Sequence, residues 1–285
     1  MKLDFMSKGL NTLPECSYDP LEVTAFNIYN NTFEQIPEEA FEMRHLKDLN
    51  ISVNRITCIP DAIDQLGELE SVDFGHNQIK RIPASFFSLA NLADYVYLHN
   101  NQLKELPDLF GKTKKIMYLN LSDNQLSELP TSIGELQELL ELRVMNNKLE
   151  ELPASLNQLK NLRELYLKNN QLKEIHFDGS RCEWHKVRVL DFEDNHIHSL
   201  GLDFSILQRL QRLNLRNNQL KTLPKEVGQA SQLIELDLRS NHLLTLPIEV
   251  LELKQLKRLD LRWNHGFEKP EWFEELAKRD CVVYL

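Results

Sequence analysis

The 285-residue chain lacks long apolar runs, an excess of positive charge and closely spaced cysteines. No run of about 18 apolar residues occurs, so we expect no membrane-spanning helix. The first residues contain no apolar core of roughly 7 to 15 residues, so we expect no Sec-type signal peptide. The formal net charge of −10 argues against nucleic acid or an anionic membrane as the main partner. These absences predict a soluble, cytoplasmic protein.

The four cysteines, Cys16, Cys58, Cys182 and Cys281, are far apart and show no CxxC pair. Their even number would permit two disulfides, but their spacing favours free thiols in a reducing compartment. Cys58 and Cys182 fall at or near interior positions of the repeat described below. We therefore expect neither of them to act as a nucleophile.

Motifs for cofactors and catalysis are also missing. The sequence has no GxxxxGK[ST], no GxGxxG opening a helix and no GxSxG. Four histidines, His176, His185, His196 and His198, lie near one another in sequence but do not secure a metal-ligand set. We expect no cofactor, no metal and no enzymatic activity.

The dominant positive signal is an internal repeat of 23 residues. An Asn-x-hydrophobic marker recurs at this spacing, with one step of 24 and one of 25. The markers are Asn31, Asn54, Asn77, Asn101, Asn124, Asn147, Asn170, Asn195, Asn218, Asn241 and Asn264. One further unit, with Lys8 in place of the asparagine, precedes them. About twelve units therefore cover residues 1–285 as one expected domain.

Each unit carries a fixed pattern of apolar residues and proline. One unit reads Ile116-x-x-Leu119-x-Leu121-x-x-Asn124-x-Leu126, and proline follows the next leucine, at Pro130. Ten of the 11 prolines occupy this one repeat position. The period-two leucines predict a short strand, and the asparagine amide can bond backbone groups at the turn. The proline segment cannot be a ladder strand and is expected as extended or 3₁₀ backbone.

This L-x-x-L-x-L-x-x-N-x-L pattern resembles the leucine-rich repeat superfamily over essentially the whole chain. The L-P-x-x-I-G-x-L segment is similar to the intracellular, Ras-suppressor-like class, which is also bacterial. The resemblance implies an α/β solenoid, a right-handed horseshoe with a concave parallel sheet and a convex side of 3₁₀ turns and short helices. It also implies non-catalytic binding on the concave face. We expect capping segments at residues 1–22 and 265–285.

The concave strand positions identify a first candidate site. Numbered from the first leucine, positions 3, 5, 7 and 8 face the concavity, and five of the seven tyrosines fall there. Tyr, Met and Arg are enriched at interfaces, although tyrosine also suits exposed strands. This register places Val96 and Leu98 in the core. The predicted partner-binding residues are Tyr95, Tyr97, His99, Tyr118, Arg143, Met145, Tyr166 and Lys168.

A second candidate site is a row of arginines at position 7. It comprises Arg216, Arg239 and Arg262, followed by Trp263. The row could dock an acidic partner. Alternatively, Asp191, Asp237 and Asp260 at position 5 could pair with the arginines and leave no binding role.

Two segments depart from the repeat and keep two interpretations each. Residues 176–186 lack the repeat proline and contain two additional residues. They form either a widened core unit or a functional bulge. Glu268, Glu271, Glu274 and Glu275 form either the solvated face of a capping helix or a translocation signal of a bacterial effector.

These observations predict a non-catalytic scaffold that binds a protein through its concave face and blocks or regulates it sterically. A monomer is favoured over a homo-oligomer. Two alternatives stay open: a bacterial effector, or effector regulator, delivered to a host cytosol by a non-Sec route, and a subunit of an enzyme complex.

Overall fold

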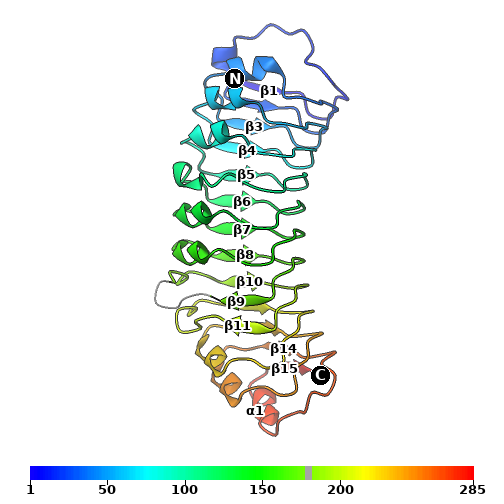
Figure 1. Ribbon diagram of the computed structural model, residues 1–285, viewed down its shortest axis with the longest axis vertical. Helices are drawn as coiled ribbons and strands as arrows, with labels where there is room; N and C mark the ends of the chain where they lie inside the picture. The colour runs from blue at the N-terminus through cyan, green and yellow to red at the C-terminus, as the bar shows by residue number, and fades with distance from the viewer. Residues whose placement is uncertain (177–181) are drawn as a thin grey trace. The chain divides into compact units, whose positions relative to one another are not determined.

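The computed structural model describes residues 1–176 and 182–285, which form two compact units (Figure 1). Unit 1 is Met1–Arg143 and unit 2 is Val144–Leu285. Each is a stack of repeats, with one strand and one return segment per repeat. That all repeats act as one domain stays a prediction.

Unit 1 has seven strands that pair in parallel, each with the strand one repeat away. The strands are β1 (Lys2–Asp4), β2 (Ala25–Asn27), β3 (Asp48–Asn50), β4 (Ser71–Asp73), β5 (Tyr95–Tyr97), β6 (Tyr118–Asn120) and β7 (Glu141–Arg143). The central residue of each strand is buried, and the residues beside it are exposed or half-buried, except for Ser71 of β4, which is buried. Val96 and Leu98 are buried, which confirms the predicted register of β5.

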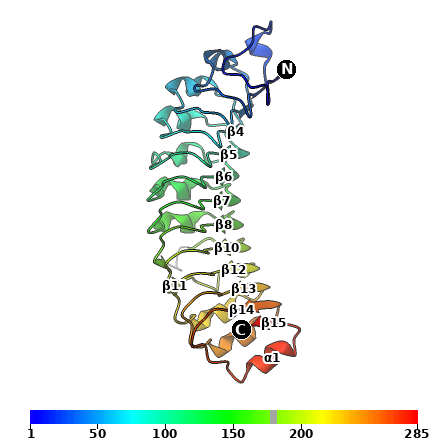
Figure 2. The ribbon, with the colours of Figure 1, turned by 90° about the vertical axis from the view of Figure 1, so that its right-hand side faces the viewer.

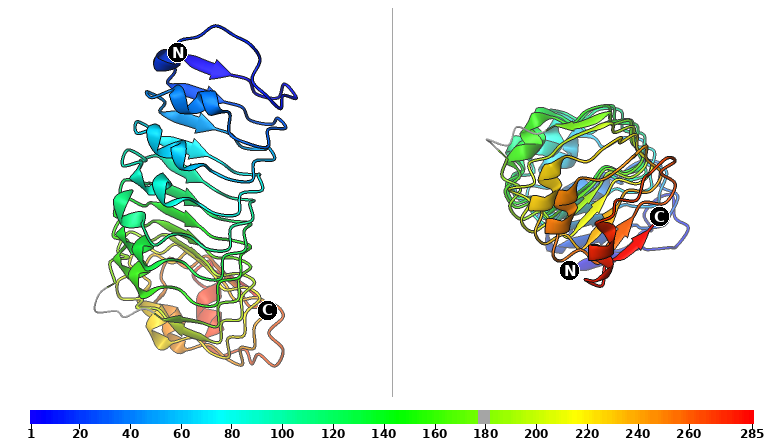
Figure 3. Two further views of the ribbon diagram at one scale, coloured as in Figure 1. Left: turned by 45° about the horizontal axis from the view of Figure 1, so that its top comes forward. Right: turned by 90° about the horizontal axis from the view of Figure 1, so that it is seen from below.

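The return segments of unit 1 contain short 3₁₀ helices. They are η1 (Pro20–Glu22), η2 (Glu38–Glu42), η3 (Asp61–Gln65), η4 (Ala84–Ser88), η5 (Phe110–Lys112) and η6 (Thr131–Glu135). The repeat proline stands at the N-cap of η2, η3, η4 and η6, where its missing N–H costs no hydrogen bond. Figures 2 and 3 show these helices on the side of the unit away from its strands.

Unit 2 continues the same pattern in its described residues. Its parallel strands are β8 (Glu164–Tyr166), β10 (Val189–Asp191), β12 (Arg212–Asn214), β13 (Glu235–Asp237), β14 (Arg258–Asp260) and β15 (Val282–Tyr284). Its helices are η7 (Ala154–Gln158), η9 (Lys225–Gln229), η10 (Ile248–Glu252) and α1 (Phe273–Ala277). The solenoid with a parallel sheet and 3₁₀ return segments is therefore confirmed.

A second, two-stranded sheet in unit 2 was not foreseen. β9 (Glu174–His176) and β11 (Ser199–Gly201) pair in parallel away from the main sheet. His176 and Gly201 stand where other repeats have proline. Both supply the N–H that proline lacks, so a ladder can form there. Residues 177–181 of the predicted bulge lie outside the described residues.

The repeat asparagines bind the backbone of neighbouring repeats, as expected. The amide nitrogen of Asn124 donates to the carbonyls of Leu98 and Leu121, each at 3.0 Å. Its oxygen accepts the N–H of Leu103 at 3.0 Å. The side chain is buried, so it satisfies polar backbone groups that water cannot reach.

The residue before each asparagine adopts a left-handed conformation, with φ between 51° and 62°. Asn, Asp, Ser and His fill most of these positions and tolerate this conformation. Val53 and Trp263 are the exceptions. Their branched and bulky side chains are strained in this left-handed conformation.

Cys182 is buried, as expected, but Cys58 is exposed. The expectation that Cys58 points into the core is therefore wrong. Its position lies in the return segment between Ile56 and Ile59, which take the two interior places.

Candidate functional site

A tyrosine patch, defined as Tyr95, Tyr97, His99 and Tyr118, lies on β5 and β6 of unit 1. The rings of Tyr95 and Tyr97 stack with centroids 4.9 Å apart. Tyr118 pairs with Tyr95 across the two strands, and it is 38% exposed. The outward strand positions therefore gather three tyrosines on adjacent strands, as the sequence predicted.

His99 is the most constrained member of the patch. Its ring lies edge-to-face against His76, with centroids 4.9 Å apart, and 6.0 Å from Tyr97. A Cβ placed on Gly75 would lie 2.3 Å from the His99 ring, so glycine allows this close approach. Burial lowers the pKa of His99, helped by His76, which favours the neutral imidazole.

Carboxylates surround the patch. Burial raises the pKa of Tyr97, and the charges of Glu141 and Asp73 raise it further. Arg143 opposes this effect, but its guanidinium is bonded to Glu141 on the same strand. The patch is therefore aromatic with an acidic border.

A feature that sequence reasoning missed involves position 5. In nine of the twelve repeats this residue is Asn or Asp, and its side chain accepts the N–H two residues later. These turns fix the end of each strand. The three exceptions are Tyr97, Arg143 and Tyr166, whose side chains cannot form the turn. Tabulating position 5 along the sequence would have revealed this.

The predicted site is divided between the two units. Tyr95, Tyr97, His99, Tyr118 and Arg143 belong to unit 1, while Met145, Tyr166 and Lys168 belong to unit 2. In unit 2, the Tyr166 hydroxyl donates to Glu164 at 2.6 Å. Lys168 lies 3.2 Å from Glu193 and 3.6 Å from Asp194. Burial opposes protonation of Lys168, but these carboxylates raise its pKa overall.

The arginine ladder, defined as Arg216, Arg239 and Arg262, is paired within the protein. Arg239 donates from Nε to Asp237 at 2.9 Å and lies 3.6 Å from Asp260. Arg262 binds the same Asp260 at 2.6 Å. Arg216 lies 3.5 Å from Glu193.

Asp260 is the centre of this network and is fully buried. Burial alone would raise its pKa, but hydrogen bonds from Arg262 and Arg258 outweigh that effect and hold the pKa below its usual value. The pairing expected as the alternative to a docking role is present. It differs from the expected surface pairs because the shared carboxylate is buried, so loss of a guanidinium would leave a buried charge with fewer partners.

Trp263 is the exposed end of the ladder. Its side chain is 53% exposed, and the Arg262 and Arg216 guanidiniums lie 5.3 and 6.0 Å from its ring. These distances allow cation–π contacts. Trp263 is the bulkiest of the residues of unit 2 that precede a repeat asparagine and take the left-handed conformation.

The remaining candidates are the potential metal-ligating residues and the glutamate cluster. In residues 1–176 and 182–285, no three His, Cys, Asp or Glu side chains form a potential metal site. Of the glutamate cluster, Glu274 pairs with Lys269 at 3.1 Å and Glu275 with Lys278 at 2.8 Å. In the same described ranges, no helix is long and apolar enough to cross a membrane.

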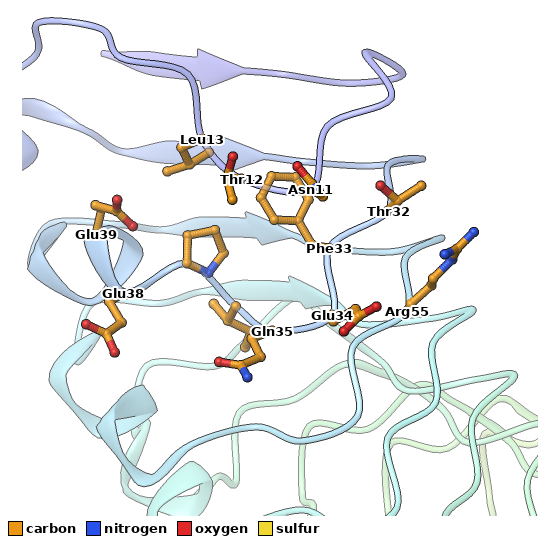
Figure 4. Close-up of a pocket in the computed structure, with 12 residues that line it drawn as sticks. Asn11, Thr12, Leu13, Thr32, Phe33, Glu34, Gln35, Glu38, Glu39 and Arg55 are labelled. Atoms are coloured by element: carbon orange, nitrogen blue, oxygen red, sulfur yellow. The ribbon is translucent and has the colours of Figure 1, made fainter.

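The end of unit 1 near β1 contains an open cavity of about 520 Å³ (Figure 4). Phe33 lies in its wall, and Glu34, Glu38 and Glu39 lie along its border. We assign it no ligand, because these three carboxylates are exposed to solvent.

Comparisons with known proteins agree with this architecture. The family model described as leucine rich repeat matches residues 22–79, 115–172 and 208–265, more than half of the chain. No curated protein matches the sequence. Among solved structures, an LRR protein of Leptospira interrogans is 26% identical, with a TM-score of 0.63, over 99% of this chain and 95% of that one.

Two further solved structures share the fold. An internalin of Listeria monocytogenes is 20% identical, with a TM-score of 0.66, over 92% of this chain and 80% of that one. A chain of the Drosophila Toll–Spatzle complex is 24% identical, with a TM-score of 0.77, over 92% of this chain and 37% of that one. The repeat, the structure and the family match together show that this chain belongs to the leucine-rich repeat family.

Proposed function

We propose that the protein is a non-catalytic scaffold that binds another protein through the outward strand face. One observation carries this proposal: Tyr97, Arg143 and Tyr166 replace a residue that closes a turn in the other nine repeats. These residues make contacts with neighbouring side chains, but none of them supplies the turn-closing acceptor. Giving up a local structural rule is typical of functional positions. Tyr and Arg are also the residues that dominate binding energy at interfaces.

The simplest mechanism is steric. Repeats held together by buried asparagine ladders lose little conformational entropy on binding, so a rigid strand face can cover a partner's surface. Occlusion of that surface would inhibit or regulate the partner. We propose a monomer that acts in the cytoplasm, and light scattering of the purified chain tests the oligomeric state.

The test is affinity capture with three proteins. The first is wild type, and the second is Tyr97→Asn/Arg143→Asn/Tyr166→Asn, which restores the turn-forming residue in all three repeats. The third is the matched control Trp263→Asn, which restores the usual residue type at the left-handed position of the arginine ladder. Both variants must show the circular dichroism of wild type and must melt cooperatively at a temperature no lower than that of wild type.

The expected result is a protein retained by wild type and Trp263→Asn but lost by the triple variant. Equal retention by all three proteins would overturn the proposed surface. Loss with Trp263→Asn alone would instead make the arginine ladder the binding site.

A further inference from the structure

A polar groove of about 890 Å³ lies in unit 2, beside the turns that follow its strands. Its first row of side chains consists of the left-handed residues that precede the repeat asparagines, from Asn169 to Trp263. Its second row consists of the residues that follow these asparagines: Gln171, His196, Gln219, His242 and His265. The groove therefore spans five successive repeats, or roughly 20 Å at the spacing of parallel strands.

The groove carries little charge. Asp194 is the single carboxylate among the described residues that line it, and neither lysine nor arginine is among them. Asp194 accepts a hydrogen bond from the amide nitrogen of Asn217 at 2.8 Å and lies 3.6 Å from the ammonium of Lys168. A strongly charged ligand would find no matching charge here, so the lining favours a neutral, polar one.

The backbone along the groove is already hydrogen-bonded. The amide nitrogen of Asn218 donates to the carbonyls of Phe192 and Leu215, at 2.9 and 3.1 Å. The backbone N–H of Asn217 donates to the carbonyl of Arg239 in the next repeat at 2.8 Å. Equivalent bonds recur in the neighbouring repeats. A peptide that adds to a sheet pairs with free backbone groups, so a ligand of this groove must be recognised by side chains instead.

The second row supplies such side chains. Its glutamines and histidines are all exposed, and within the described part of the chain their side chains form no hydrogen bond or ion pair. Amide and imidazole groups can both donate and accept hydrogen bonds. A hydroxyl group also does both, so a ligand rich in hydroxyl groups matches this row.

Trp263 adds an apolar surface at the end of the first row. Its side chain is 53% exposed, and its backbone has a φ of 62°, where the four earlier members of the row are Asn, Asp or Ser. A strained backbone conformation of this kind is typical of functional sites. The flat ring can pack against the C–H face of a sugar while its indole N–H bonds a hydroxyl group.

We propose that this polar groove binds a neutral, extended oligosaccharide, with one sugar ring on Trp263 and the hydroxyl groups of the next sugars on the second row. The volume lies within the range of about 300–1,000 Å³ that is typical of small-ligand sites. The inference goes beyond the proposed function, because Tyr97, Arg143 and Tyr166 do not line the groove.

The test titrates the full chain with two neutral, extended oligosaccharides, cellohexaose and chitohexaose, in a calorimeter. A neutral peptide of alternating glycine and serine and a sulfated heparin oligosaccharide serve as controls. We expect at least one of the two sugars to bind and neither control to bind. Tryptophan emission should shift to shorter wavelength on binding, through Trp263, because Trp184 is buried and Trp272 is half-buried outside the groove.

Two variants locate the binding on the groove. Trp263→Asn restores the usual residue type of the first row and should weaken sugar binding at least about tenfold. Gln171→Ala/Gln219→Ala removes two free amides and should weaken it about threefold to tenfold. The matched control, Gln78→Ala/Gln102→Ala, changes the same repeat position in unit 1 and should have an effect under about twofold.

The inference would be overturned if neither sugar bound, or if Trp263→Asn bound the sugar as tightly as wild type. Equal weakening by the two glutamine variants, or tighter binding of the peptide than of both sugars, would also contradict it. Failure of the proposed function is distinct. Tyr97→Asn/Arg143→Asn/Tyr166→Asn should bind the sugar as wild type does, whether or not it loses the captured protein.

Discussion

The tyrosine patch of unit 1 and the arginine ladder of unit 2 both use outward positions of the repeat, but their polar groups are paired in different ways. In the ladder, each arginine has a carboxylate partner, and Asp260 is shared by three guanidiniums. In the patch, the turn-forming residue is absent at Tyr97, and aromatic rings pack against one another instead. The comparison indicates that a row of charged side chains can serve structure alone, whereas loss of the usual turn-forming residue at position 5 indicates a binding role.

The largest effect should come from leaving Asp260 with too few partners. We expect Arg239→Met/Arg262→Met to lower the free energy of unfolding by roughly 3 kcal/mol, because a buried carboxylate loses two guanidiniums. Arg216→Met, whose partner Glu193 is less buried, should cost under about 1 kcal/mol. Urea unfolding measures both. Equal costs would show that the ladder is not a buried network.

The next effect concerns left-handed residues. Val53→Asn should raise the free energy of unfolding by about 1 kcal/mol, because a branched side chain is strained at φ 54°. Trp263→Asn should gain less, since the tryptophan ring also contacts Arg216 and Arg262. Thermal melting of both variants checks the order, and a larger gain for Trp263→Asn would contradict it.

Position 5 of the repeat allows the turn-forming residue of one repeat and the tyrosine of another to be exchanged. Asn50→Tyr should cost about 1 kcal/mol of unfolding free energy, because the Ser52 N–H loses its acceptor. Tyr97→Asn should be neutral or slightly stabilising, since it supplies the acceptor that this repeat lacks. Chemical denaturation compares the pair. If Tyr97→Asn is the more destabilising change, the tyrosine serves packing rather than binding.

The smallest effect depends on pH. The pKa of His99 is lowered in the folded protein, so unfolding binds a proton and stability falls as pH drops below the unfolded value of about 6.5. The pKa of Asp260 is also lowered, but its contribution is present above about pH 3.8 and is lost only below it.

Urea unfolding of wild type and His99→Asn between about pH 7.5 and 5 isolates the histidine. We expect wild type to lose under about 1 kcal/mol relative to the variant, because the ring is only half-buried. Asp260→Asn should show no change relative to wild type in this range. If wild type were instead more stable relative to His99→Asn at about pH 5 than at about pH 7.5, the sign of the prediction would be wrong.

The repeat made most of the fold predictable from the sequence. Asn124, Leu119 and Pro130 each recur at fixed spacing, so their roles in ladder, core and 3₁₀ return segment follow from one unit. The outward register of Tyr95 and Tyr97 also followed, because Val96 and Leu98 must fill the core.

Other features depend on contacts between particular neighbours, which the period does not encode. The burial of Asp260 arises from three arginines on its own and adjacent strands. The close packing of His99 on Gly75 depends on the residue one repeat earlier. The pairing of β9 with β11 required two successive repeats to lose proline, which the sequence shows only at His176 and Gly201.

The central claim is that Tyr97, Arg143 and Tyr166 are kept for binding at the expense of the local turn. The most direct measurement is a calorimetric titration of the captured partner into wild type and into Tyr97→Asn/Arg143→Asn/Tyr166→Asn. Our account predicts at least about thirtyfold weaker binding by the variant, equivalent to the loss of one interface hot spot, with melting unchanged or raised. Equal affinity for the two proteins would contradict it.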